Sequence, residues 1–218
     1  MEGLINDDLF RVQNGLFPSN TYFLKSSLSR DCIIIDPGLD KIAIQKKLVE
    51  LSLNPIAIMS THGHFDHIGS VSYFKVKYNI PFYLHRSDVK LSKSANFFLT
   101  IAKIPIQIDT PIPDVIIEGK EQTITINEFK LGVYNLPGHS AGSCVIQNEK
   151  YLFSGDIMYK KGLGLNNFPG EDKIKLKSSI HEIFRLFEND SLILPGHGEF
   201  EYLGNIAQSN QDLIRFLM

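Results

Sequence analysis

Short apolar segments that stop abruptly at turns are the feature that most restricts what this chain can fold into. Residues 32–36 form a continuous β-branched run typical of a buried strand, and Pro37-Gly38 ends it. From 40 to about 53 the apolar residues instead follow the period of an amphipathic helix. This change of period recurs along the chain. It predicts an α/β fold in which sheets pack between helical layers.

The same patterns place the other elements. Three prolines between 103 and 114 predict a loop or an edge there. No low-complexity segment or linker interrupts the pattern, so we expect one domain over 1–218. Strands are predicted over 21–24, 56–59, 82–84, 123–126, 129–136, 143–147, 151–153 and 192–194, and helices up to about 78, over 87–100, around 180–187 and over 204–218.

Composition excludes several classes of function. The net charge of −2 and the pI of about 6.4 lack the basic excess of a broad nucleic-acid surface. Two cysteines cannot form a multi-bridge framework, and no apolar run approaches the length of a membrane helix. The first residues also lack the pattern of a secretory signal. We therefore expect a cytoplasmic protein that acts on a small molecule, with no nucleic-acid or membrane partner; the sequence does not set its oligomeric state.

A loop after the 56–59 strand carries four metal-binding side chains within six residues: His62, His64, Asp66 and His67. Imidazoles and a carboxylate suit Zn²⁺, Mn²⁺ or Fe²⁺. His62 and His64 alternate along an extended chain, so both can point to one side. Asp66 and His67 are adjacent and are expected to diverge, which suits two neighbouring metals. Such a density of ligands rarely serves only as a turn.

Three more candidate ligands, His139, Asp156 and His197, each follow a short apolar strand directly. Strand ends are where ligands gather in open α/β folds. Each residue alone is a weak signal, but the three in this order, together with the first loop, indicate one metal site. His85 is expected at a partly exposed strand end, and His181 on an exposed helix face.

At these residues the sequence resembles the metallo-β-lactamase superfamily of hydrolases. The HxHxDH signature and the Pro-Gly-His, Gly-Asp and Pro-Gly-His-Gly elements occur in that family's order between residues 20 and 198. The resemblance implies an α/β (α+β) fold, the four-layer αββα sandwich of the metallo-β-lactamase type. It also implies two divalent ions, the first held by His62, His64 and His139, the second by Asp66, His67 and His197, with Asp156 bridging them.

The activity that this resemblance implies is hydrolysis. Two metal ions would lower the pKa of a shared water and so supply hydroxide near neutral pH. Asp66 would orient that water or carry its proton. Zinc is the first expectation for the metal, and the same ligands also accept iron or manganese. The expected substrate is a thioester or a related small ester, and a negatively charged one would be attracted because the loaded site would be positive.

Within the superfamily, the chain is most similar to short hydroxyacylglutathione hydrolase (glyoxalase II)-like proteins, on the segments 154–156, 162–164 and 168–172. That branch has a basic residue directly after the second glycine of the segment matching 162–164. This chain has Leu165 there, followed by Asn166 and Asn167. Full-length members also place a helical glutathione-binding domain after the last ligand, whereas 21 residues follow it here. We therefore expect a substrate other than, or bound more loosely than, a glutathione thioester.

Substrate contacts are otherwise unassigned, and the candidates are Tyr159, Lys160 and Lys161. One alternative function is a persulfide dioxygenase of the same superfamily, in which positions matching His62, His139 and Asp156 hold one iron. A nuclease, a lactonase and a secreted β-lactamase are less favoured. Metal content and oxygen uptake would separate the hydrolase from the dioxygenase.

Overall fold

The computed structural model describes residues 4–165 and 168–218. The chain divides into two compact units, Met1–Ile117 (unit 1) and Glu118–Met218 (unit 2), each described here by itself. Asn166 and Asn167 lie outside the described residues, as do the first three residues of the chain. The expectation of a single domain over 1–218 stays a prediction.

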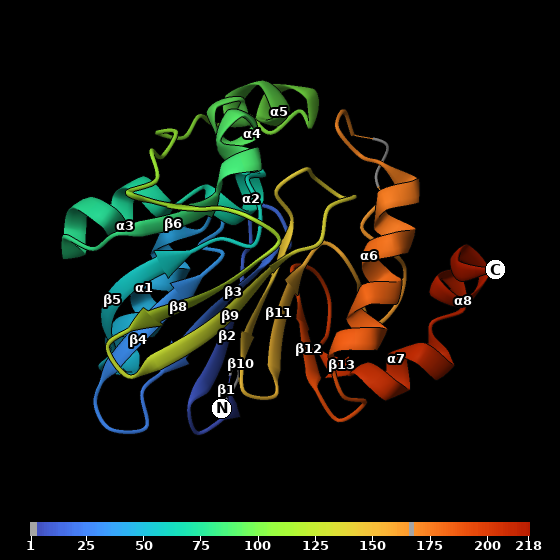
Figure 1. Cartoon of the computed structure of the whole chain (residues 1–218). Helices are drawn as coiled ribbons and strands as arrows, with labels where there is room; N and C mark the ends of the chain where they lie inside the picture. The colour runs from blue at the N-terminus through green and yellow to red at the C-terminus, as the bar shows by residue number, and fades with distance from the viewer. Residues whose placement is uncertain (1–3, 166–167) are drawn as a thin grey trace. The chain divides into compact units, whose positions relative to one another are not determined.

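Unit 1 contains a seven-stranded mixed sheet whose strand order follows the chain (Figure 1). The strands from β1 to β4 pair antiparallel, and those from β4 to β7 pair parallel. The apolar run that the sequence identified as a buried strand lies at the centre of this sheet. The strands are β1 (Leu4–Asn6), β2 (Leu9–Gln13), β3 (Asn20–Lys25), β4 (Asp31–Ile35), β5 (Asn54–Met59), β6 (Phe82–His85) and β7 (Val115–Ile117).

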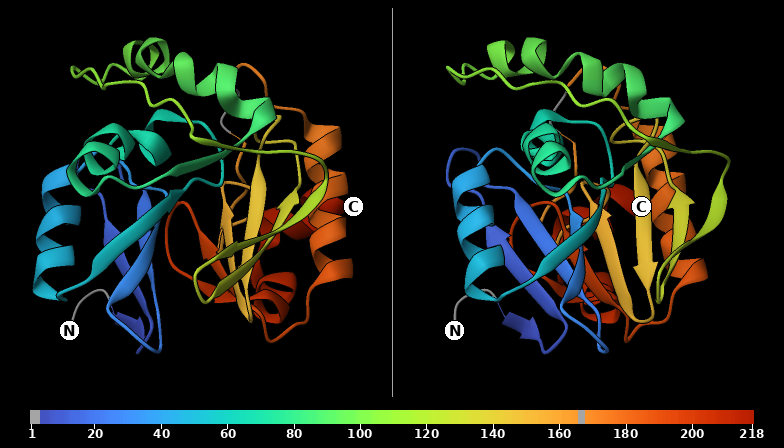
Figure 2. Two further views of the ribbon diagram at one scale, coloured as in Figure 1. Left: turned by 60° about the vertical axis from the view of Figure 1, so that its left-hand side comes forward. Right: turned by 90° about the vertical axis from the view of Figure 1, so that its left-hand side faces the viewer.

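The helices of unit 1 connect the parallel strands, and α1 lies beside the sheet in Figure 2. Asp40 caps α1 by accepting a hydrogen bond from the Ala43 N–H. The helix expected over 87–100 is broken at Ser94, which ends one helix and begins the next. The Ser94 hydroxyl donates to the Lys90 carbonyl. The helices are α1 (Lys41–Glu50), α2 (Phe65–Ile68), α3 (Val71–Tyr78), the 3₁₀ turn η1 (Arg86–Asp88), α4 (Val89–Lys93) and α5 (Ala95–Ile101).

Unit 2 contains a six-stranded sheet in the order β13-β12-β11-β10-β9-β8. Its strands pair antiparallel except for β11 and β12, which are parallel and are joined through a helix. The strands are β8 (Glu121–Ile126), β9 (Phe129–Asn135), β10 (Cys144–Asn148), β11 (Tyr151–Gly155), β12 (Leu192–Pro195) and β13 (Glu201–Tyr202).

The helices α6 (Lys173–Leu186), α7 (Leu203–Ser209) and α8 (Gln211–Leu217) cover one face of this sheet. Their buried residues form one apolar core with alternate residues of the strands, and α6 lies along the sheet in Figure 1. The single helix expected over 204–218 is two helices, because Asn210 interrupts it. The Asn210 side chain accepts from the Leu213 N–H and so begins α8.

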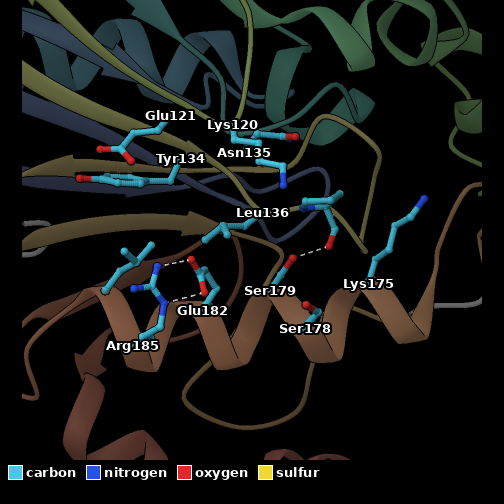
Figure 3. Close-up of a pocket in the computed structure, with 12 residues that line it drawn as sticks. Lys120, Glu121, Tyr134, Asn135, Leu136, Lys175, Ser178, Ser179, Glu182 and Arg185 are labelled. Carbon is cyan, nitrogen blue, oxygen red and sulfur yellow. Dashed lines mark hydrogen bonds and ion pairs between the residues drawn. The ribbon is translucent and has the colours of Figure 1, made fainter.

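The outer edge of α6 and the end of β9 enclose a hollow of about 470 Å³ (Figure 3). Ser179 fixes the helix to the sheet by donating to the Pro137 carbonyl at 2.6 Å. Glu182 and Arg185, which line this hollow, form an ion pair with each other. Among the helices over the described residues, none combines the length and apolar character needed to cross a bilayer.

Candidate functional site

Unit 1 brings the four predicted ligands of the first loop together after β5. His62, His64, Asp66 and His67 are all buried. The ring centroids of His62 and His64 are 4.8 Å apart, and those of His62 and His67 are 4.1 Å apart. The convergence of the two alternating histidines is as expected from an extended chain.

The expected divergence of Asp66 and His67 is wrong. Both lie in α2 rather than in a loop, and Oδ2 of Asp66 is 3.4 Å from Nε2 of His67. The helical backbone turns the two neighbouring side chains toward the same point instead of to opposite sides. Their oxygen and nitrogen are therefore placed to share a single ion.

Asp36, which directly follows β4, organises this loop. Its Oδ1 accepts from the Thr61 N–H at 2.7 Å, and its Oδ2 accepts from the Thr61 hydroxyl at 2.7 Å. Oδ2 also lies 3.0 Å from Nδ1 of His67. A carboxylate can only accept, so the Nδ1 of His67 carries the proton and its Nε2 carries the lone pair that a metal needs.

The same argument fixes the tautomer of His62. Its Nδ1 is 3.1 Å from the Thr61 hydroxyl oxygen. Because that hydroxyl gives its hydrogen to Asp36, its oxygen must accept from His62. The Nε2 of His62 is thus again the nitrogen that could bind a metal.

Backbone contacts hold the rest of the loop. The Gly63 N–H donates to Oδ2 of Asp88 at 2.8 Å, and a Cβ on Gly63 would lie 2.8 Å from the Asp88 carbonyl oxygen. The Ser19 hydroxyl donates to the Asp66 carbonyl at 2.8 Å. The loop therefore follows a path that only glycine can take at position 63.

Unit 2 brings its three predicted ligands together around Asp156. Oδ2 of Asp156 lies 3.6 Å from Nε2 of His139 and 3.3 Å from Nε2 of His197. Asp156 and His139 are buried, whereas the His197 side chain is 24% exposed. Both imidazole nitrogens therefore lie close to the same oxygen of the Asp156 carboxylate.

His139 is oriented by a backbone group. Its Nδ1 lies 2.8 Å from the carbonyl oxygen of Gly164, which can only accept, so Nε2 is once more the nitrogen that could bind a metal. Gly164 approaches so closely that a Cβ there would lie 1.5 Å from the Asp156 carbonyl oxygen. Glycine at 164 is therefore required for the loop to reach both ligands.

The three candidate substrate residues lie beside His197. The rings of Tyr159 and His197 meet edge to face, with centroids 5.9 Å apart. Lys160 forms an ion pair with Glu201 at 3.0 Å, and Lys161 is exposed. Leu165 is partly buried and packs against the apolar core of the unit 2 helices.

The remaining histidines differ from each other. His85 is buried, so the expectation of a partly exposed strand end is wrong; its Nδ1 accepts from the Ser87 N–H and caps η1. His181 is exposed on α6, as expected. The sequence analysis missed Asp36 and Thr61. The available signal was that Asp36 stands at the end of an apolar strand before Pro-Gly, in the same setting as the ligands that were found.

Both units therefore carry His and Asp side chains that could hold a metal ion. The donor set fits a divalent metal, because three of the rings have Nδ1 bound to a fixed acceptor and present Nε2. Neutral imidazole and carboxylate are ligands of zinc, iron and manganese.

Known proteins share both the sequence and the fold. The model of the metallo-beta-lactamase superfamily matches residues 14–197. The chain is 33% identical over 190 residues to the probable metallo-hydrolase YqgX of Bacillus subtilis, covering 86% of this chain and 89% of that protein. It is 29% identical over 184 residues to the hydroxyacylglutathione hydrolase GloC of Haemophilus influenzae, covering 83% of this chain and 86% of that protein.

Among solved structures, the BLEG-1 B3 metallo-beta-lactamase matches with a TM-score of 0.86 at 31% identity, covering 94% of this chain and 99% of the other. This confirms the predicted fold class, an α+β sandwich with two mixed sheets and flanking helices. The chain belongs to the metallo-β-lactamase superfamily of metallo-hydrolases.

Proposed function

We propose that this protein is a binuclear metallo-hydrolase that cleaves a thioester or a related small ester. The observation that carries the proposal is the fixed tautomer of His62, His67 and His139, each of which is held through Nδ1 by an acceptor. Histidines that serve only as polar core residues do not need Nε2 turned to one side in this way. Metal ligands do need it.

Zinc is the first candidate metal, with iron or manganese as alternatives. The assignment follows the superfamily: the first metal on His62, His64 and His139, the second on Asp66, His67 and His197, and Asp156 between them.

Bound divalent ions would lower the pKa of a water and polarise the carbonyl of the substrate. The residues of the chain then have separate tasks. Asp66 is buried, and its carboxylate can orient the attacking water and hold its proton at Oδ1, the oxygen that does not share an ion with His67. Water adds to the carbonyl carbon and the carbon–sulfur bond breaks, which releases a carboxylic acid and a thiol. The Asp36 contacts keep His67 from rotating during these steps.

Two relatives indicate the substrates to test. GloC is a hydroxyacylglutathione hydrolase and is 29% identical to this chain over 184 residues, which favours a thioester. BLEG-1 is a B3 metallo-beta-lactamase and is 31% identical to this chain, so a β-lactam is the second candidate. Leu165 stands where glyoxalase II-like proteins carry a basic residue, so glutathione itself is not the expected thiol.

The test is metal analysis of protein purified without added metal, followed by turnover assays on the same sample. The assays cover thioesters, oxoesters and β-lactams, together with oxygen uptake in the presence of a glutathione persulfide. Two equivalents of metal with thioester turnover support the proposal. One equivalent of iron with oxygen consumption would replace it by the dioxygenase alternative.

A substitution at the bridging position tests the binuclear arrangement. Asp156→Ala should reduce the metal content below one equivalent and reduce kcat by about 10³-fold or more, because both ions lose a ligand. Asp212→Ala, an exposed aspartate on α8, is the control and should change neither. If the Asp156 variant kept two metals and full activity, the two-metal model would be wrong.

A further inference from the structure

Two neighbouring hollows in unit 2 share the same pair of lysines. The first, of about 360 Å³, is lined by Tyr159, Lys160, Lys161 and the segment from His197 to Glu199. The second, of about 450 Å³, is lined by the same two lysines together with Glu201 and three polar residues of α7. Lys160 and Lys161 therefore form a ridge between a hollow that contains a predicted metal ligand and one that does not.

The walls of the two hollows differ in chemistry. Beside His197, the first hollow offers the Tyr159 ring, the bare backbone of Gly198 and the methylene stems of the lysines, all of which suit an apolar group. The second offers the side chains of Asn205, Gln208 and Ser209, which suit a polar group. A ligand that spans the ridge would thus be apolar near the metal ligand and polar beyond it.

The two lysines do not carry equivalent charges. Lys160 pairs with Glu201 at 3.0 Å, and Glu201 also accepts from the Asn205 side chain at 2.9 Å. The Asn205 contact and then Lys160 lower the pKa of the Glu201 carboxyl, so the pair is charged and mutually neutralised near pH 7. Within residues 4–165 and 168–218, Lys161 makes no ion pair. Lys161 is therefore the cation of the ridge that can bind an external anion.

Glu199 limits where that anion can lie. Its carboxylate belongs to the first hollow, two residues from His197. An anion inside the first hollow would meet the negative charge of Glu199, whereas one placed at Lys161 would be attracted. The apolar wall of the first hollow therefore suits the uncharged segment of a ligand whose anion lies at Lys161.

We propose that these hollows bind the leaving-group arm of the substrate, a thiol with an apolar segment next to sulfur and a carboxylate or phosphate that Lys161 contacts. This inference rests on the proposed thioester hydrolysis and specifies its substrate class. Tyr159 forms the wall against which the apolar segment packs.

The hollow beside α6 is a poorer candidate. None of the predicted ligands lines it, and its Glu182 and Arg185 neutralise each other (Figure 3). A substrate bound there would have no reactive group within reach.

The experiment compares two thioesters that differ in one charge: an acyl thioester of a mercaptoalkanoic acid and that of its methyl ester. Wild type should prefer the acid, measured as the ratio of the two kcat/KM values. Lys161→Gln should reduce this ratio about fivefold through KM, as expected for an exposed ion pair. Lys160→Gln should reduce it less, because Glu201 already neutralises Lys160. Lys173→Gln, an exposed lysine that lines neither hollow, is the control.

A binding measurement separates this inference from the proposed function. Calorimetric titration with the non-hydrolysable thioether of the same acid should show weaker binding to Lys161→Gln than to wild type and to the control. Turnover of both thioesters with an unchanged ratio in Lys161→Gln would overturn the inference and leave the hydrolase proposal standing. Binding that depends on Lys161, in a protein that hydrolyses neither thioester, would retain the pocket and refute the hydrolase.

Discussion

Replacing Asp36 with asparagine tests whether the orientation of the histidines controls metal binding. The substitution keeps the size of the side chain and suits the backbone, since Asp36 has a φ of 52°, a region that asparagine tolerates. It removes the charge and converts one acceptor oxygen into a donor. The carboxylate now serves two donors on Thr61 and one on His67.

The structure sets the size of the effect. If the amide oxygen stays near His67, the amide nitrogen faces the Thr61 N–H, and one buried donor loses its acceptor at a cost of about 1–3 kcal/mol. If the amide turns round, its nitrogen faces Nδ1 of His67 and favours the tautomer that carries the proton on Nε2, which blocks the metal. Both arrangements weaken the site, so we expect metal affinity to fall by about 10- to 100-fold.

The assay is competition with a chelator for the bound metal, together with urea unfolding of the metal-free protein. Asp31→Asn is the matched control, because Asp31 begins the same strand and contacts Asn54 near the surface. The control should keep the metal affinity of wild type. Asp36→Asn with unchanged affinity and unchanged unfolding midpoint would refute the argument that Asp36 orients the ligand.

Two further substitutions test the backbone that carries the unit 2 ligands. Gly138→Ala should lower the free energy of unfolding by about 1–3 kcal/mol, because its Cβ would lie 2.3 Å from the Leu176 backbone. The control in urea unfolding is Gly170→Ala, which is also at positive φ but has no atom of the described residues within 4 Å of its Cβ position. Equal losses of unfolding free energy in the two variants would contradict the clash. Asp172 caps α6, and backbone N–H contacts lower the pKa of its carboxyl, so the stabilisation by this cap is present above the unfolded pKa and is lost as pH falls through the lower folded value. Asp172→Asn caps the helix without titrating, so in this variant the urea midpoint should change less with pH below about pH 4 than it does in wild type. A pH profile identical to that of wild type would show that the cap does not titrate.

Most elements of the fold were predictable because the sequence changes its apolar period where the structure changes. The buried run at 32–36 is β4, and the helical spacing after Asp40 is α1. Two of the errors fall where one polar side chain competes with a helix for backbone hydrogen bonds. Ser94 divides the helix expected over 87–100, and Asn210 divides the last one. Period alone does not reveal such a residue, since both positions are compatible with a helix.

The candidate ligands could be named from the sequence because they stand at strand ends in a dense pattern, and their metal binding stays a prediction. The groups that orient them were less visible. Gly164 contacts His139 through its backbone carbonyl, a group that every residue has, so the residue type does not predict this contact. The sequence shows only that position 164 has no side chain. Asp36 lies 31 positions from His67, and only the pairing of β4 with β5 brings the two together. A contact of this kind depends on sheet register, which spacing along the chain does not specify.

The loop that carries the candidate substrate residues shows how distant parts of unit 2 define one site. Asn210 donates from its side chain to the carbonyls of Tyr159 and Gly162, at 3.0 and 2.9 Å. The residue that interrupts the last helix is therefore also the residue that holds this loop. Because the same loop delivers the Gly164 carbonyl to His139, a change at Asn210 should disturb both the metal ligand and the lysine ridge. We therefore predict that Asn210→Ala changes substrate preference and metal affinity together, because both would depend on the backbone of a single loop.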